Sequence, residues 1–247
     1  GGEGSVAVAF DKDTGKELWK ALSAREPGYS APSIIEAGGT RQLLIWHCAA
    51  VNSLNPDTGK VYWSIPLEPA YGMSIMAPRK SGDYLFASGI GEVGVLLKLD
   101  AGKPGASEIW RSSIKSGVYC SNSTPFIDNG TIYGCCCKQG QLRGVKLETG
   151  DRLWETFAPT TGKSRANSGT AFIVKHEDRF FLFSETGDLI LAKLSPEKYE
   201  ELGRFHVLKP TGECFGREVA WSHPAFAERS LFARNDEELV CVSLAAE

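Results

Sequence analysis

Residues 10–19 read FDKDTGKELW, and the chain returns to this pattern along its whole length. Further copies are LNPDTGKVYW at residues 54–63, KLETGDRLW at 146–154, LDAG at 99–102 with IW at 109–110, and a degenerate LSPE at 194–197 with LG at 202–203. The glycines of the four clearer copies lie 43–48 residues apart: Gly15, Gly59, Gly102 and Gly150. Such a period is typical of repeat proteins, in which one supersecondary unit per repeat packs against its neighbours.

Each copy has the chemistry of a β-hairpin. Alternating apolar residues before the turn, such as those at 6–10, predict one strand. An Asp or Asn followed by Thr-Gly predicts a tight turn, because the Asx side chain bonds the backbone ahead and Gly accepts a positive φ. The next residues predict a second strand that carries a large aromatic ring, and these rings are expected to pack towards neighbouring sheets: Trp19, Trp63, Trp110 and Trp154.

Two further strands are predicted between consecutive hairpins. The paired segments are residues 29–35 with 42–46, 71–77 with 84–87, 124–127 with 131–133, 169–174 with 179–183, and 223–226 with 230–233. Four short strands per repeat, with no helical period, are typical of a propeller blade. The sequence therefore predicts an all-β fold, a β-propeller of four-stranded antiparallel blades that forms a single domain over residues 1–247.

The strand count predicts an incomplete ring. Residues 6–19 supply the two outer strands of one blade, four complete blades follow, and residues 238–244 end a last blade at its third strand. A propeller closes by lending a strand from the opposite terminus, because open strand edges invite aggregation. Here one strand is surplus to that closure, so we expect that blades preceding residue 1 are missing.

The bulk composition narrows the class of partner. The chain has 247 residues, 42% of them hydrophobic, and a net charge of −3, which gives no reason to expect nucleic acid or an anionic membrane. No apolar run approaches the roughly 20 residues of a membrane-spanning helix. Seven cysteines are too few for a disulfide scaffold of this size, and the odd number leaves at least one unpaired.

The Asp-x-x-Thr-Gly-x-x-x-Trp pattern resembles the tryptophan-docking repeat of the pyrroloquinoline quinone (PQQ) type. That repeat occurs in quinoprotein dehydrogenases, in the outer-membrane assembly lipoprotein of the BamB kind, and in secreted PQQ-like repeat proteins of planctomycete-type bacteria. The resemblance covers residues 6–244 and implies an eight-bladed ring, of which this chain holds about five and a half blades. It also implies a periplasmic or secreted protein, and it makes PQQ a cofactor worth testing, although the residues themselves predict no cofactor.

The loops before the innermost strands are expected to meet at one mouth of a central channel. The candidate ligand-binding residues there are Tyr29, Tyr71, Asn122, Arg165, Asn167, Arg217, Glu218, Trp221 and His223. Aromatic rings beside amides, guanidinium groups and a carboxylate suit a polar ligand such as a sugar or peptide. In the alternative interpretation the Tyr and Trp rings only fill the channel and Arg217 pairs with Glu218.

Residues 217–223 are the densest group of these candidates. We expect this segment to precede and open the innermost strand of the last blade. Strand alternation would then put Trp221 and His223 on one face, and Pro224 supports the extended conformation.

Other motifs are better explained by structure than by chemistry. Cys135, Cys136 and Cys137 lie in a predicted second strand, where successive thiols alternate between faces and pack as small apolar groups. Residues 11–15 resemble a calcium loop only weakly, because the glycine is one place early and no bidentate Glu follows. We therefore predict no metal site and no catalytic residue.

Two classes of function remain open. The first is a non-catalytic, extracytoplasmic binding or scaffold propeller for a protein or carbohydrate ligand. The alternative is a PQQ-dependent dehydrogenase or another channel-centred enzyme. The short loops favour the binding module over this alternative, because they leave little room for a cofactor and its metal.

Overall fold

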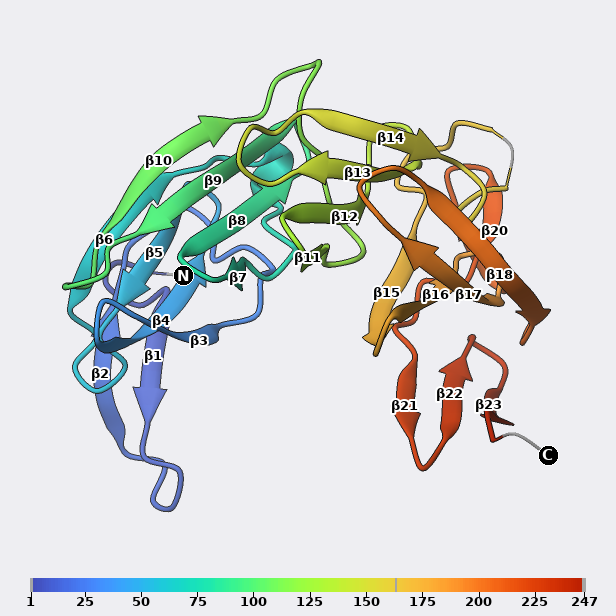
Figure 1. Ribbon diagram of the computed structural model, residues 1–247. Helices are drawn as coiled ribbons and strands as arrows, with labels where there is room; N and C mark the ends of the chain where they lie inside the picture. Colours follow the sequence, from blue (N-terminus) through green and yellow to red (C-terminus); the bar gives the residue numbers. More distant parts are fainter. Residues whose placement is uncertain (1, 163, 246–247) are drawn as a thin grey trace. The chain divides into compact units, whose positions relative to one another are not determined.

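The computed structural model describes residues 2–162 and 164–245 of the chain. Strands account for its regular structure, and the one helical turn in these residues is a 3-10 turn, η1 (Ala70–Gly72) (Figure 1). None of the described helices has the length and apolarity needed to cross a bilayer. The predicted all-β class is confirmed.

Four complete sheets follow one another along the chain, and each has four antiparallel strands in sequence order. They are β3 (Ser33–Ala37), β4 (Thr40–Trp46), β5 (Ala50–Leu54) and β6 (Val61–Pro66); β7 (Arg79–Ser81), β8 (Tyr84–Gly89), β9 (Val93–Leu99) and β10 (Ala106–Arg111); β11 (Phe126–Asp128), β12 (Thr131–Cys135), β13 (Leu142–Lys146) and β14 (Arg152–Thr156); β15 (Ala171–His176), β16 (Arg179–Ser184), β17 (Asp188–Leu194) and β18 (Tyr199–His206).

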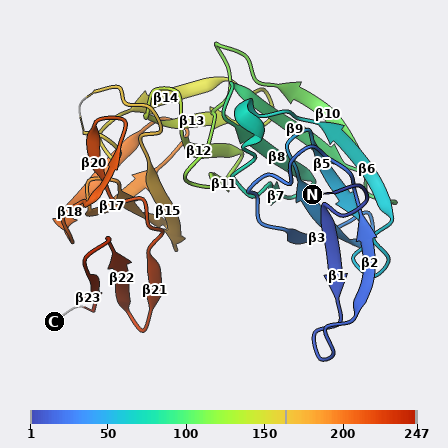
Figure 2. The same cartoon turned by 180° about the vertical axis from the view of Figure 1, so that it is seen from behind.

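Two partial sheets flank the complete ones in the sequence. β1 (Ala7–Phe10) and β2 (Glu17–Ala21) form a two-stranded hairpin whose turn projects away from its neighbours in both Figures 1 and 2. β21 (Ala225–Ala227), β22 (Ser230–Arg234) and β23 (Leu239–Ser243) form a three-stranded sheet. The described strands therefore follow the predicted succession of two, four times four, and three, apart from an additional two-stranded sheet, β19 (Gly212–Cys214) and β20 (Arg217–Val219), that the sequence analysis did not predict.

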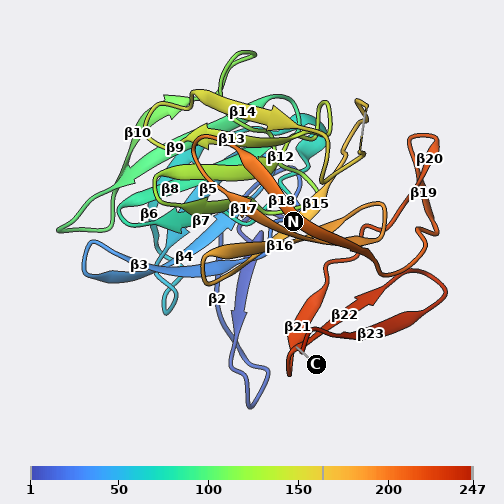
Figure 3. The ribbon, with the colours of Figure 1, turned by 45° about the vertical axis from the view of Figure 1, so that its right-hand side comes forward.

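The structure corrects the prediction for residues 217–223. β20 (Arg217–Val219) does not lead into the innermost strand of the last blade, because it pairs with β19 (Gly212–Cys214) in a separate hairpin, visible in Figure 3. β21 begins only at Ala225, because Pro224 has no N–H to give to a ladder. Trp221 and His223 thus lie in the connection between the hairpin and β21, and the predicted strand alternation of the two is wrong.

The repeated turn forms as its chemistry requires. Asp11 Oδ1 accepts hydrogen bonds from the Thr14 backbone N–H (2.8 Å) and from Thr14 Oγ1 (2.7 Å), and Gly15 has φ 70°. Asn55 Oδ1 likewise accepts from the backbone N–H of Thr58 at 3.0 Å. The Asx side chain replaces a backbone partner inside the turn, so the hairpin closes from local sequence alone.

A β-bulge precedes the aromatic position in every copy of the motif. Trp19 pairs with Ala9 and Glu17 with Phe10, so Leu18 has no opposite residue. The same shift occurs in β6, β10 and β14, and again in the degenerate copy, where Gly203 stands at the Trp position. A bulge bends a strand and changes the direction of its side chains. The same bulge therefore sets the direction of the Trp side chain in each of the four clear copies.

Three of the four Trp indoles reach the next repeat. The indole N–H groups of Trp19, Trp110 and Trp154 donate to the carbonyls of Pro56 (3.0 Å), Leu147 (2.8 Å) and Ser195 (2.8 Å) respectively. Each acceptor lies in the turn between the third and fourth strands of the following sheet. The repeat therefore joins neighbouring sheets by both ring packing and a hydrogen bond.

Trp63 is the exception. Its indole donates to Gln42 Oε1 within its own sheet, at 3.0 Å. The turn that follows in the next sheet is the lengthened one at residues 100–105, which lacks the regular motif. The Trp that precedes this lengthened turn thus has a partner in its own sheet, while Trp110, which follows the turn, donates to the next repeat like Trp19 and Trp154.

The chain forms two compact units. Unit 1 is Gly1–Ser121 with Leu147–Gly150, and unit 2 is Asn122–Lys146 with Asp151–Glu247. In unit 2 an apolar core joins the sheets β11–β14 and β15–β18, with residues such as Tyr133, Phe180 and Leu182 fully buried. The candidate site lies in the same unit.

Candidate functional site

The candidate site is a cleft of about 730 Å³ in unit 2. Four connections surround it: the turn after β12, the segment between β14 and β15, the turn after β16, and the β19–β20 hairpin. The lining residues are Lys138, Gln139, Thr161, Ser164, Arg165, Ala166, Asn167, Glu185, Thr186, Phe215, Arg217 and Glu218. Most of these side chains are cationic, amide or hydroxyl groups, so the cleft suits a polar ligand.

Glu185 is the buried centre of the cleft, with 2% of its surface exposed. Its Oε1 accepts from Arg217 Nε (2.8 Å), and its Oε2 accepts from Arg217 Nη2 (3.0 Å). Oε2 also accepts from the Trp221 indole and from the backbone N–H of Thr170, both at 3.0 Å. Bidentate pairing with a guanidinium and two further donors satisfies a carboxylate that would otherwise be costly to bury.

Arg217 is therefore held as a structural cation. Its Nη2 also donates to the carbonyl of Asn167 at 2.9 Å, and its guanidinium lies 5.8 Å from the centre of the Trp221 ring. These contacts tie the β19–β20 hairpin to the turn after β16 and to the segment before β15. The alternative in which Arg217 pairs with Glu218 is wrong, because Glu218 points to Lys209, 3.8 Å away.

Phe215 occupies the tip of the same hairpin. It has φ 50° and the following Gly216 has φ 74°, the two positive values of a two-residue hairpin turn. A left-handed conformation costs a non-glycine residue about 1–2 kcal/mol. The Phe215 side chain is nevertheless 63% exposed and lines the cleft, so the strain presents an apolar ring to solvent rather than burying it.

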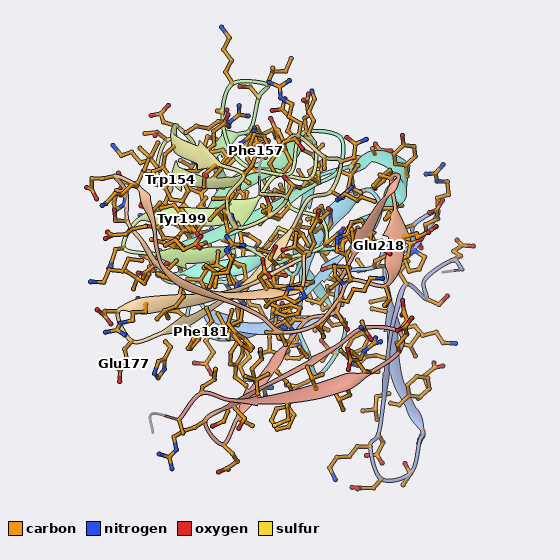
Figure 4. All side chains as sticks on the ribbon, turned by 90° about the vertical axis from the view of Figure 1, so that its right-hand side faces the viewer. Trp154, Phe157, Glu177, Phe181, Tyr199 and Glu218 are labelled. Carbon is orange, nitrogen blue, oxygen red and sulfur yellow. The ribbon has the colours of Figure 1, made fainter. Side chains whose placement is uncertain are left out.

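The cleft collects four of the nine residues predicted from sequence: Arg165, Asn167, Arg217 and Glu218. Trp221 donates a hydrogen bond to Glu185 of the cleft, but the Trp221 side chain lines a second, smaller pocket of about 260 Å³ beside β19. Figure 4 shows Glu218 well separated from Glu177 and Phe181. Glu177 lies in the turn between β15 and β16, and Phe181 lies within β16.

The other four predicted residues lie elsewhere. Tyr29 and Tyr71 belong to unit 1 and are 66% and 81% exposed. The side-chain amide of Asn122 donates to the Ser168 carbonyl at 3.5 Å. His223 packs against Phe172, with ring centres 4.9 Å apart, and its Nδ1 donates to the Pro224 carbonyl at 2.8 Å.

Sequence reasoning missed Glu185 and Phe215. Glu185 sits in the stretch SETGD at residues 184–188, which reads as an ordinary polar turn. Phe215 precedes a glycine, and that pair is a hairpin signal, but residues 212–219 are too few for strands to stand out. Only the fold brings the carboxylate of Glu185 under the guanidinium of Arg217, 32 positions away.

The cysteine run lies beside the cleft but is not part of it. β12 ends at Cys135, so Cys136 and Cys137 begin the following turn rather than continuing the strand as predicted. All three are buried. Burial raises the pKa of the Cys135 thiol to about 12, and its sulfur accepts a hydrogen bond from the Ala171 N–H at 3.2 Å. A thiol of this kind packs and does not react at neutral pH.

Metal binding has no candidate in the described part of the chain. Over residues 2–162 and 164–245, no group of three or more His, Cys, Asp and Glu side chains is placed to hold an ion.

Comparison with solved structures shows the same fold in other proteins. The crystal structure of BamB from Moraxella catarrhalis has a TM-score of 0.66 at 15% identity, over 95% of this chain and 65% of that one. A europium-containing methanol dehydrogenase has a TM-score of 0.61 at 8% identity, over 92% and 57%. Quinohemoprotein alcohol dehydrogenase from Comamonas testosteroni has a TM-score of 0.60 at 11% identity, over 93% and 48%. At such identities the likeness concerns the fold alone.

The chain spans less than two thirds of the length of each of these structures. A comparison with curated proteins found no match. The sequence model of one protein family, described as outer membrane protein assembly factor BamB, matches residues 47–247. The matched residues include β5 and β6 of the first complete sheet, all strands of the other three complete sheets, and every residue that lines the cleft. The chain is therefore a β-propeller repeat protein that belongs to the BamB family.

Proposed function

We propose that this chain is a non-catalytic binding or scaffold module, periplasmic or secreted, whose protein or carbohydrate ligand is held in the cleft of unit 2. One observation carries the proposal: cationic, amide and hydroxyl side chains and one exposed ring surround an open space of about 730 Å³. Membership of the BamB family is consistent with an extracytoplasmic protein.

The state of the buried carboxylate favours binding over catalysis. A general base must be within hydrogen-bond reach of the proton it removes and able to accept it. Both oxygens of Glu185 already accept hydrogen bonds from Arg217, Trp221 and Thr170. Glu185 therefore acts as an anchor for the hairpin, and the cleft offers its remaining polar groups for recognition.

A quinone-dependent dehydrogenase is the second candidate, supported by the fold likeness to two dehydrogenases. Metal-assisted quinone chemistry needs several oxygen ligands that are free to bind a cation. In the cleft the carboxylate of Glu185 is occupied by donors and that of Glu218 is directed to Lys209. These residues do not fit a metal-bound PQQ, and we assign no redox step to them.

The test is a binding screen of the whole chain against arrays of glycans and peptides. We expect the parent to retain ligands that a double variant, Arg165→Ala with Phe215→Ala, loses by at least about tenfold in affinity. Arg179→Ala is the matched control, because Arg179 is exposed at the start of β16, outside the cleft lining. Equal retention by the parent and the double variant would exclude the cleft as the site.

Dye-linked oxidation of alcohols and sugars after addition of PQQ and Ca²⁺ separates the two candidates. The binding proposal expects no turnover above the background of the reagents. Turnover that depends on PQQ would instead support the dehydrogenase.

A further inference from the structure

We infer that the ligand of this cleft is an acidic glycan, an oligosaccharide that contains hexuronate residues. The inference rests on the proposed function and names its ligand class. It is carried by three features of the cleft: an excess of positive charge, an exposed ring at a strained hairpin tip, and a lining with almost no apolar side chains.

Besides Arg217, the cations of the cleft lining are Lys138 and Arg165, and Arg165 carries the proposed recognition. Glu185 and Arg217 neutralise one another, and the carboxylate of Glu218, which also lines the cleft, lies 3.8 Å from the ammonium group of Lys209. Arg165 is exposed on the cleft lining and forms no hydrogen bond or ion pair with any described residue. A planar guanidinium of this kind matches a carboxylate in a two-bond, charge-assisted geometry, and a neutral sugar has no charge to pair with it.

The ring comes from Phe215. The Arg217–Glu185 pair holds the hairpin by its base, and the turn holds Phe215 in a left-handed conformation with the side chain exposed. Backbone strain that is kept at an exposed position points to a role outside folding. An apolar ring beside polar groups suits the C–H face of a pyranose, which stacks on aromatic side chains.

The rest of the lining favours a sugar over a peptide. Of the lining residues only Ala166 and Phe215 are apolar. Protein partners are held by apolar anchors in dry pockets, and this cleft has no aliphatic pocket for them among its lining side chains. Amide and hydroxyl groups, such as those of Asn167 and Thr161, are the partners that sugar hydroxyls need.

The experiment measures binding of oligogalacturonate to the whole chain by calorimetry, beside the same oligosaccharide with every carboxyl group methyl-esterified. We expect the acid to bind at least about tenfold more tightly than the ester, and the difference to shrink as salt is added. Arg165→Gln removes the preference for the acid. Phe215→Ala weakens both ligands by a similar factor. Arg179→Gln leaves both affinities unchanged.

Three outcomes would overturn the inference. Equal affinity for acid and ester would remove the role of charge while leaving a glycan-binding module. Tight binding of a poly-glutamate peptide, with no binding of oligogalacturonate, oligomannuronate or oligoglucuronate, would replace the glycan by a protein and leave the proposed function standing. An unchanged acid preference in a folded Arg165→Gln variant would move the site away from this cleft.

Discussion

At the scale of single residues, the buried ion pair between Glu185 and Arg217 is the most consequential contact in unit 2. Removing one partner of a buried pair leaves the other charge uncompensated, which costs more than the pair contributes. We predict that Arg217→Ala lowers the free energy of unfolding by about 3 kcal/mol. The value lies at the lower end of the usual range because the Arg217 side chain keeps 22% of its surface exposed.

Urea denaturation monitored by Trp fluorescence checks this value. Glu218→Ala is the control: its side chain is 57% exposed, and we expect a change within about 0.5 kcal/mol. A double variant, Glu185→Leu with Arg217→Met, removes both charges and should recover much of the loss. If Arg217→Ala proved as stable as Glu218→Ala, the pair would not anchor the hairpin.

At the scale of elements, the turn glycines do two different things, and a matched pair of variants separates them. Gly15 and Gly59 have almost the same backbone, with φ 70° and 72°. A Cβ on Gly15 would meet nothing within 4 Å, whereas a Cβ on Gly59 would lie 2.6 Å from the Trp19 ring. Alanine therefore introduces backbone strain at both positions and a clash between sheets at only one.

We predict that Gly15→Ala costs about 1–2 kcal/mol from backbone strain. Gly59→Ala should cost this amount and a further 1–3 kcal/mol or so, because the Trp19 ring must move from its place on the turn. Chemical denaturation of both variants under one condition gives the difference. Equal losses would mean that the contact between the turn and the Trp19 ring contributes little to the joining of these sheets.

At the scale of the whole molecule, the acid stability of unit 2 depends on Asp188. Burial acts to raise the pKa of Asp188, but hydrogen bonds from His206 Nδ1 (2.7 Å), Arg204 and Thr186 outweigh it, so the pKa is lowered. A carboxyl whose pKa is lower in the folded state stabilises the fold above its unfolded pKa of about 3.9. This stabilisation is lost as the pH falls through the folded pKa.

We therefore predict that the parent loses stability steeply below about pH 4, and that Asp188→Asn is less stable at neutral pH but flatter across this range. Urea midpoints measured from about pH 6 to about pH 3 give both curves, which should converge at the acid end. Asp178→Asn, at an exposed site, should keep the slope of the parent. Parallel curves for the parent and Asp188→Asn would contradict the prediction.

The sequence alone was enough for the elements that depend on local chemistry. Asp11 and Asn55 close their turns with atoms two or three residues away, and strand alternation follows from neighbours. The repeat period, the strand succession and the outer-strand position of each Trp could therefore be predicted. The bulge before each Trp could not, because a bulge appears only when two strands are paired and one residue lacks a partner.

Tertiary structure decided the contacts between residues that are distant in the chain. Trp63 donates to Gln42 and not to the next repeat, and Arg217 pairs with Glu185 and not with its neighbour Glu218. Phe215 lines the cleft from a hairpin of two three-residue strands. For Trp63 and Arg217, the sequence contains several residues that could accept their hydrogen bonds. Which partner is reached depends on how the sheets place side chains tens of residues apart, and local composition carries no information about that placement.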